Sequence, residues 1–161
     1  MDKVRVGIIG VGYLGMQHAR ILTYLEEAEL RSVADINFKK AVEIGNRHGV
    51  AYCQNYEDML DDIDAAIVAT PTSEHHAVTL NLLRHGKSVL VEKPITETVE
   101  QAEELVAEAK ANGLVLQVGH LERFNPAVEA VETMIKEPRS SRSRGWGRSR
   151  RDLSTSTSCL T

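Results

Sequence analysis

Val4-Arg-Val-Gly-Ile-Ile-Gly-Val-Gly-Tyr-Leu-Gly15 is the stretch of sequence that decides the fold. Its first half is rich in β-branched apolar residues, as a central parallel strand that is covered on both faces requires. Its second half reads G-x-G-x-x-G, and a run without Gly or Pro follows at residues 16–25. A strand, a glycine turn and a helix in this order predict a dinucleotide site. There Gly10 allows the tight turn, Gly12 lets a pyrophosphate approach, and Gly15 lets the helix pack on the strand. A glycine-rich turn without a ligand is the alternative.

The next predicted strand, residues 29–35, ends in Asp35, twenty positions after Gly15. A carboxylate at this place accepts hydrogen bonds from the two ribose hydroxyls of adenosine and repels a 2′-phosphate. Asp35 therefore favours NAD over NADP and strengthens the dinucleotide interpretation. A solvated aspartate at a strand end is the simpler alternative.

Strand and helix patterns alternate along the chain up to about residue 137. Apolar β-branched runs predict the strands, and capping residues with apolar residues at helical spacing predict the helices. We expect strands at 4–9, 29–35, 50–53, 64–69, 88–92 and 114–118, and helices at 16–25, 38–48, 56–60, 72–85, 99–112 and 126–137. This order predicts an α/β fold with a doubly wound, mainly parallel Rossmann sheet of about six strands.

Two further segments follow predicted strands at the sheet edge where α/β proteins bind ligands. Thr70-Pro71 comes after the strand at 64–69, and Glu92-Lys93-Pro94 comes after the strand at 88–92. The ammonium of Lys93 can hydrogen-bond a nicotinamide ribose or a substrate hydroxyl, and it can assist proton transfer as hydride leaves a carbinol carbon. A surface lysine at a strand end is an equally open interpretation.

The composition predicts a soluble protein with one domain's worth of chain, because its 161 residues are 42% hydrophobic. No apolar run approaches the ~20 residues of a membrane helix, and Met1-Asp2-Lys3 leads straight into the first strand, so no signal peptide is predicted. Cys53 and Cys159 show no metal-ligand spacing and no evident pairing, which suits a reducing cytoplasm. His75 and His76 are adjacent rather than one turn apart, and no metal site is predicted.

The net charge of −4 conceals an acidic body and a basic tail. Residues 1–138 carry 13 Lys and Arg against 22 Asp and Glu, whereas residues 139–161 carry six Arg, one Asp and ten Ser or Thr. The acidic body disfavours nucleic acid as a partner. The tail has no hydrophobic period, and we expect it to be disordered. One interpretation of the tail is a basic arm for nucleic acid or an anionic surface.

Five motifs in this order resemble the glucose-fructose oxidoreductase/inositol dehydrogenase (Gfo/Idh/MocA) family. They are Gly10-Val-Gly-Tyr-Leu-Gly15, Asp35, Ala69-Thr-Pro-Thr-Ser-Glu-His75, Gly86-Lys-Ser-Val-Leu-Val-Glu-Lys-Pro94 and Gly119-His-Leu-Glu-Arg-Phe-Asn-Pro126. The resemblance covers residues 3–138 and looks most like the nucleotide-sugar members, such as UDP-N-acetylglucosamine 3-dehydrogenases. The family joins an N-terminal Rossmann domain to a C-terminal α/β domain, which supplies most substrate contacts and the dimer face.

The resemblance implies an NAD-dependent dehydrogenase that acts on a CH–OH group of a sugar or nucleotide sugar. It implies cofactor contacts by Gly10, Gly12, Tyr13, Leu14, Gly15, Asp35, Thr70, Pro71, His75, Glu92 and Lys93. It also implies a catalytic role for Lys93 and His120, and substrate contact by Arg123. The family's catalytic histidine in the second domain has no counterpart here, so we expect a cofactor-binding half that is inactive alone.

We accordingly expect an NAD-binding domain at 1–125, a helix at 126–138 that leads to the absent second domain, and the tail at 139–161. A possible set of codons for Ser156–Thr161, regrouped by one base, encodes Ile-Asp-Val-Val-Leu-Asp, which resembles the family's entry into its second domain. We therefore interpret the tail as a frameshift product, a hypothesis that sequencing of the gene near Arg139 tests.

Family members are homo-oligomers, but their usual dimer face belongs to the second domain, which is missing here. Two alternatives to a dehydrogenase remain open from the sequence. One is a non-catalytic NAD-binding or interaction module whose tail binds nucleic acid or an anionic surface. The other is a Rossmann-like structural domain that binds no nucleotide.

Overall fold

The computed structural model describes residues 3–134 of the chain. This part divides into two compact units, one that ends at His120 and one that begins at Leu121. The predicted Arg/Ser-rich tail at 139–161 and its proposed frameshift lie outside the described residues.

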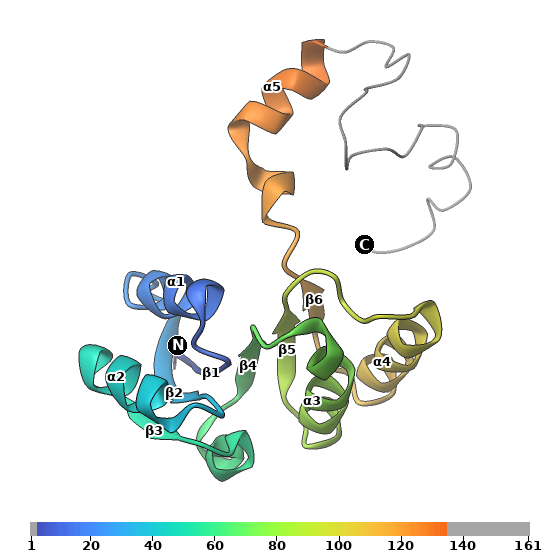
Figure 1. Cartoon of the computed structure of the whole chain (residues 1–161). Helices are drawn as coiled ribbons and strands as arrows, with labels where there is room; N and C mark the ends of the chain where they lie inside the picture. The colour runs from blue at the N-terminus through green and yellow to red at the C-terminus, as the bar shows by residue number, and fades with distance from the viewer. Residues whose placement is uncertain (1–2, 135–161) are drawn as a thin grey trace. The chain divides into compact units, whose positions relative to one another are not determined.

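The first unit contains a six-stranded sheet with the order β3-β2-β1-β4-β5-β6, in which all neighbouring strands are parallel (Figure 1). Its strands are β1 (Val4–Ile9), β2 (Ala28–Ala34), β3 (Ala51–Cys53), β4 (Ala65–Val68), β5 (Ser88–Val91) and β6 (Leu116–Val118). Its helices are α1 (Tyr13–Leu22), α2 (Phe38–His48), α3 (Thr72–Arg84) and α4 (Val99–Ala111), with a 3₁₀ segment η1 (Tyr56–Asp62). The α/β Rossmann fold that the sequence predicts is confirmed.

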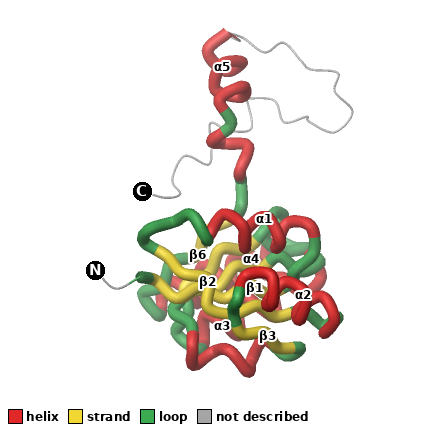
Figure 2. Tube along the Cα trace, turned by 90° about the vertical axis from the view of Figure 1, so that its left-hand side faces the viewer, coloured by secondary structure: helices red, strands yellow, loops and turns green. Residues whose placement is uncertain are grey.

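Helices cover both faces of this sheet (Figures 1 and 2). The helices α1 and α2 pack on one face, and α3 and α4 pack on the other. Successive residues of β4 illustrate the two faces. Ala66 and Val68 pack with the side chains of α3 and α4, whereas Ile67 belongs to the cluster that contains residues of α1 and α2. Burial on both faces explains why these strands are apolar throughout rather than alternating.

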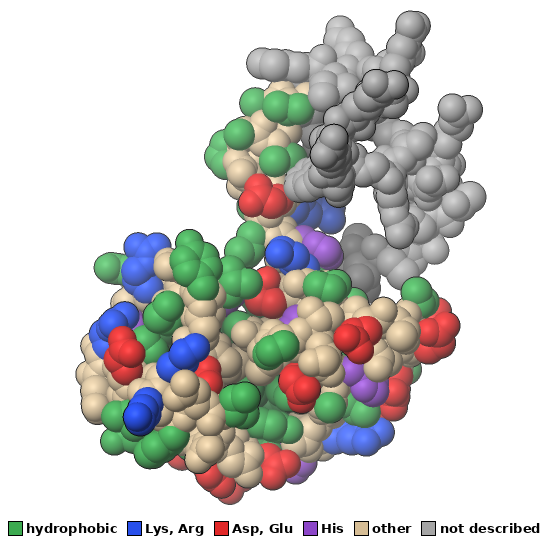
Figure 3. All heavy atoms as spheres, in the orientation of Figure 1, with side chains coloured by type: hydrophobic (Ala, Val, Ile, Leu, Met, Phe, Trp, Pro, Cys, Tyr) green, Lys and Arg blue, Asp and Glu red, His purple; other side chains and the backbone are tan. Residues whose placement is uncertain are grey.

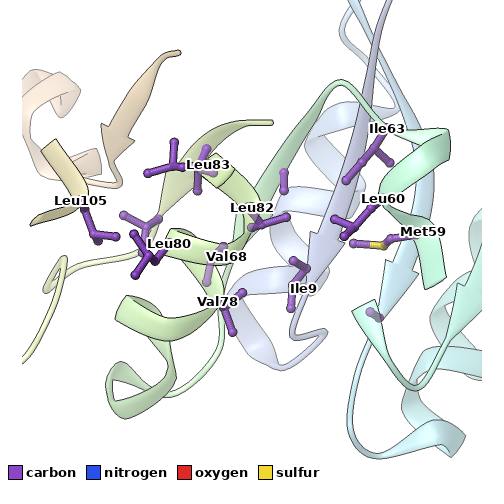
Figure 4. Close-up of a cluster of buried hydrophobic side chains, with 14 of the residues drawn as sticks. Ile9, Met59, Leu60, Ile63, Val68, Val78, Leu80, Leu82, Leu83 and Leu105 are labelled. Carbon is purple, nitrogen blue, oxygen red and sulfur yellow. The ribbon is translucent and has the colours of Figure 1, made fainter. Parts of the chain in front are cut away.

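The larger hydrophobic cluster ties α3 and α4 to the sheet, and Figure 4 shows its main side chains. Leu82, Leu83 and Leu105 are fully buried at its centre, and Ile63 closes it beside η1. Full burial of each such side chain stabilises the fold by roughly 1.5–3 kcal/mol. This packing fixes the sheet whose carboxyl edge carries the site described below.

The first helix begins at Tyr13, three residues earlier than the sequence pattern predicts, and ends at Leu22. The prediction treated Gly15 as part of the turn, but Gly15 lies inside the first turn of α1. It occupies that place because a Cβ on it would overlap with the carbonyl oxygen of Gly10. The helix therefore starts directly after Gly12.

The second unit, where it is described, consists of η2 (Leu121–Phe124) and α5 (Pro126–Met134). The side chain of Asn125 accepts a hydrogen bond from the N–H of Ala127 at 3.0 Å, and Pro126 stands at the first helical position, where no N–H is needed. The helix predicted at 126–137 is present as far as Met134, and its last residues lie outside the described part. The 3₁₀ turn at the start of this unit was not predicted.

On the face drawn in Figure 3, Lys and Arg side chains gather over α1 and α2, while Asp and Glu side chains are spread over α3 and α4. No helix in the part of the chain that the structure describes is long and apolar enough to cross a membrane. Between residues 3 and 134, no three metal-ligating side chains come together.

Candidate functional site

A cleft of about 790 Å³ lies at the carboxyl edge of the sheet, where the strand order reverses between β1 and β4. Open α/β sheets bind ligands at this switch point. Three chain segments line the cleft, one after each of β1, β2 and β4. Their residues are Gly10, Gly12, Tyr13, Leu14, Asp35, Ile36, Asn37, Lys40, Ala69, Thr70, Pro71, Ser73 and Glu74.

Two glycines of the G-x-G-x-x-G motif are required by the packing of the protein itself. Gly10 has a φ of +87°, and a Cβ there would lie 2.7 Å from the carbonyl oxygen of Ala69. A Cβ on Gly15 would overlap with the carbonyl oxygen of Gly10. The missing side chain at Gly10 lets the glycine loop pack against the end of β4, and the missing side chain at Gly15 lets α1 pack against the loop.

Gly12 differs from both, because a Cβ on it would meet no protein atom within 4 Å. It is the N-cap of α1, no side chain caps this end, and the first turn contains no acidic residue. The N–H groups of the first helical turn have no partners within the helix. Partial positive charge and free donors thus face open space, which is the arrangement that binds an anion.

Asp35 follows β2 and is held beside the glycine loop by two hydrogen bonds. Its Oδ2 accepts from the backbone N–H of Val11 at 2.9 Å, and its Oδ1 accepts from the N–H of Asn37 at 2.8 Å. Each carboxylate oxygen can accept a further bond. The carboxylate therefore lies in the cleft wall in a fixed orientation with unused acceptor capacity.

Thr70 carries a buried hydroxyl that has no hydrogen-bond partner among the described residues. Such a group costs about 1–3 kcal/mol unless a ligand or water satisfies it. Thr70 and Pro71 line the cleft, and the backbone of Thr70 lies next to Gly10. An unsatisfied polar group in the wall of a cleft points to a polar ligand.

His75, Glu92 and Lys93 do not line this cleft. His75 is 1% exposed, and its ring nitrogens lie 2.9 Å from the carbonyl oxygen of Thr70 and 2.8 Å from that of Pro94. Glu92 is 3% exposed, and its Oε1 lies 2.8 Å from Nε2 of His18. Lys93 is exposed after β5, and its cofactor contact remains a prediction.

The two residues predicted near the substrate lie in different units. His120 is the exposed last residue of the first unit, and its N–H donates to the carbonyl oxygen of Val118 at 2.7 Å. Arg123 is an exposed residue of η2 in the second unit. Their roles remain predictions.

The cleft wall also contains residues that the sequence did not single out, among them Ile36, Asn37 and Lys40. Ile36 is 88% exposed, which is unusual for a side chain of this size and hydrophobicity. An apolar residue directly after a strand-end aspartate is the signal that would have drawn attention to it. It provides an apolar surface next to the Asp35 carboxylate.

Residues 4–120 match the model of an oxidoreductase family with an NAD-binding Rossmann fold, Gfo/Idh/MocA. The chain is 36% identical over 129 residues to UDP-N-acetylglucosamine 3-dehydrogenase from Acidithiobacillus ferrooxidans. The aligned region covers 80% of this chain and 41% of that enzyme. Over 137 residues it is 33% identical to the NAD⁺-dependent scyllo-inositol 2-dehydrogenase of Bacillus subtilis, covering 83% of this chain and 40% of that enzyme.

Solved structures give the same result. The Acidithiobacillus ferrooxidans enzyme superimposes with a TM-score of 0.76 at 34% identity, over 83% of this chain and 44% of the other. A 3-ketoreductase from Actinomadura kijaniata, in complex with TDP-benzene and NADP, superimposes with a TM-score of 0.78 at 31% identity, over 83% and 43% of the two chains. The chain thus spans about two fifths of the length of the curated relatives it matches.

Proposed function

The chain belongs to the Gfo/Idh/MocA oxidoreductase family and carries its NAD-binding Rossmann domain, and on this premise we propose that it is the cofactor-binding part of an NAD-dependent dehydrogenase for sugars. The proposed reaction is the oxidation of a CH–OH group of a sugar or nucleotide sugar, as the names of its relatives suggest. NAD supplies the hydride acceptor in such chemistry.

The observation that carries this proposal is the unfilled space at Gly12. A Cβ there would contact no protein atom within 4 Å, so packing within the described protein does not require a glycine at that position. A pyrophosphate that contacts the backbone at this point does explain it. The partnerless hydroxyl of Thr70, which belongs to the cleft lining, supports the same conclusion, because a bound cofactor offers it a partner.

The residues of the cleft suit the parts of NAD. The N–H groups at the start of α1 bind the pyrophosphate, and the carboxylate of Asp35 accepts hydrogen bonds from the adenosine ribose. The negative charge of Asp35 disfavours the 2′-phosphate of NADP. The apolar side chain of Ile36 provides a surface for the adenine ring.

We propose that Lys93 and His120, both in the first unit, act at the reacting end of the cofactor. Lys93 follows β5, and its ammonium forms no hydrogen bond or ion pair among residues 3–134. A free ammonium donates hydrogen bonds to a ribose or substrate hydroxyl and stabilises negative charge as the hydroxyl loses its proton. His120 and Arg123 are proposed to contact the substrate. We expect this chain alone to turn over no sugar, because substrate orientation requires more than a cofactor site.

Titration of the full chain with NADH and with NADPH, followed by nicotinamide fluorescence, tests the proposal. Saturable binding with tighter affinity for NADH is expected. Absence of binding for both would overturn the proposed function. Tighter binding of NADPH would contradict the role of Asp35 and leave the fold-based assignment to a nucleotide site intact.

A further inference from the structure

Two buried histidines contact the two ends of the Glu92–Pro94 segment. Nε2 of His18, on α1, lies 2.8 Å from Oε1 of Glu92. Nδ1 of His75, on α3, lies 2.8 Å from the carbonyl oxygen of Pro94. Since α1 and α3 pack on opposite faces of the sheet, the segment is held from both sides.

The contact with His18 satisfies a buried carboxylate. Glu92 is 3% exposed and His18 is 9% exposed. A carboxylate in such surroundings is costly unless it is hydrogen-bonded. Its Oε2 accepts from the backbone N–H of Lys93 at 3.3 Å, and a Cβ on Gly119 would lie 3.0 Å from that same oxygen. The carboxylate of Glu92 is thus enclosed by the imidazole ring of His18, the backbone of Lys93 and the backbone of Gly119.

The contact with His75 joins the segment to the cleft wall. The second ring nitrogen, Nε2, lies 2.9 Å from the carbonyl oxygen of Thr70. Carbonyl oxygens only accept hydrogen bonds, so each of these two contacts is a hydrogen bond only where the ring nitrogen on that side carries a proton. Thr70 lines the cleft and Pro94 follows Lys93. One buried ring therefore contacts both the cleft wall and the segment that carries the lysine.

The side chain of Lys93 has no such restraint. It is exposed, and its ammonium has no hydrogen-bond or ion-pair partner among residues 3–134. The direction in which it extends depends on the backbone of the segment that carries it. We propose that His18 and His75 are positioning residues, which hold the Glu92–Pro94 segment so that Lys93 meets the nicotinamide end of NAD. This inference rests on the proposed NAD-binding function.

A comparison of two ligands tests this on the full chain. NADH extends to the nicotinamide end, whereas ADP contains only the adenosine and pyrophosphate. We expect Lys93→Ala and His18→Leu each to weaken NADH binding by about fivefold or more, the effect of one lost hydrogen bond, with ADP affinity unchanged. His75→Leu should weaken NADH binding at least as much, and because His75 also contacts Thr70 in the cleft wall it is not used for the comparison with ADP. The double variant His18→Leu/Lys93→Ala should be no weaker than Lys93→Ala, because His18 acts through the lysine.

A matched control is available on α3. His76 pairs with Glu104 at the same 2.8 Å, away from the Glu92–Pro94 segment, and His76→Leu should change neither affinity. His18→Gln keeps an amide nitrogen within reach of Glu92 and should restore NADH binding. His18→Asn is polar but shorter, and it breaks the pair in a second way if His18→Leu does not fold.

The outcomes separate the two proposals. A wild-type chain that binds neither NADH nor ADP would overturn the proposed function. A wild-type chain that binds both, with His18 variants that lose NADH and ADP affinity equally, would overturn the positioning role. Additive effects in the double variant, or failure of His18→Gln to restore binding, would overturn it as well.

Discussion

The carboxylate of Asp35 accepts a hydrogen bond from the backbone N–H of Val11 at 2.9 Å, although the two residues are 24 positions apart in the sequence. The acidic end of β2 and the glycine loop after β1 are therefore one connected structure. A change at Asp35 is therefore expected to act both on the proposed contact with the adenosine ribose and on the glycine loop.

Replacing Asp35 by Asn should reduce the preference for NAD. The variant loses the charge that repels a 2′-phosphate and a charged hydrogen-bond acceptor for the ribose. We expect NADH affinity to fall about tenfold and the ratio of NADPH to NADH affinity to rise, measured by fluorescence titration. An unchanged ratio would show that Asp35 does not face the ribose.

Alanine at Gly12 and at Gly15 should have opposite effects. Gly12→Ala places a methyl group in open space but replaces a favoured N-cap residue, so the free energy of unfolding should fall by about 1 kcal/mol at most while NADH binding is lost. Gly15→Ala forces a methyl group against the Gly10 carbonyl and should destabilise the protein by about 1–3 kcal/mol or more. Urea unfolding and NADH titration of both variants provide the measurements. Equal loss of stability in the two would contradict the assignment of Gly12 to a ligand.

Thr70→Val should weaken NADH binding without lowering the free energy of unfolding. The hydroxyl of Thr70 is buried without a partner among the described residues, so its replacement by a methyl group should leave stability unchanged or raise it by up to about 1 kcal/mol. NADH binding should weaken if a cofactor satisfies this hydroxyl. Thr79 is the control, because its hydroxyl is also buried and partnerless but does not line the cleft. Thr79→Val should therefore affect stability alone.

The ion pair of Arg5 and Asp64 should make stability depend on pH in the acid range. Arg5 donates to the Asp64 carboxylate at 2.6, 2.9 and 3.1 Å. These side-chain and backbone hydrogen bonds lower the pKa of Asp64 from 3.8 to about 2. Because the folded state binds fewer protons than the unfolded chain in this range, the contribution is complete above about pH 4 and is lost as the pH falls through 2.

Asp64→Asn should abolish this contribution. The difference in free energy of unfolding between wild type and variant should be small, since both partners are partly exposed, and it should shrink between pH 4 and pH 2. Urea unfolding at low salt over this range measures it. A difference that stays constant with pH would mean that the pair does not form.

The fold was predictable because its signals are local. Each signal can be read from residues close together in the sequence: the β-branched run of β1, the glycines after it and the position of Asp35 at the end of the next strand. The alternation of strands and helices then predicts a parallel sheet. The start of α1 was missed for a physical reason. Gly15 reads as a turn residue in sequence, but its lack of a side chain serves close contact with Gly10.

The supports of the site were not predictable, because they depend on contacts between distant segments. His18 and Glu92 are 74 positions apart and meet only after α1 and β5 have packed on the same sheet. His75 was predicted to touch the cofactor, and its bonds to two carbonyl oxygens follow from the arrangement of two loops. No sequence period reveals such pairs.

The two outer strands of the sheet, β3 and β6, contain three residues each, whereas β1 at its centre contains six. A long exposed edge strand is a template on which another chain adds its own strand, and short edges remove that template. The sheet of this chain therefore offers little opportunity for edge-to-edge aggregation. The sheet edges should therefore not prevent the preparation of concentrated protein solutions, which affinity measurements with a weakly bound ligand require.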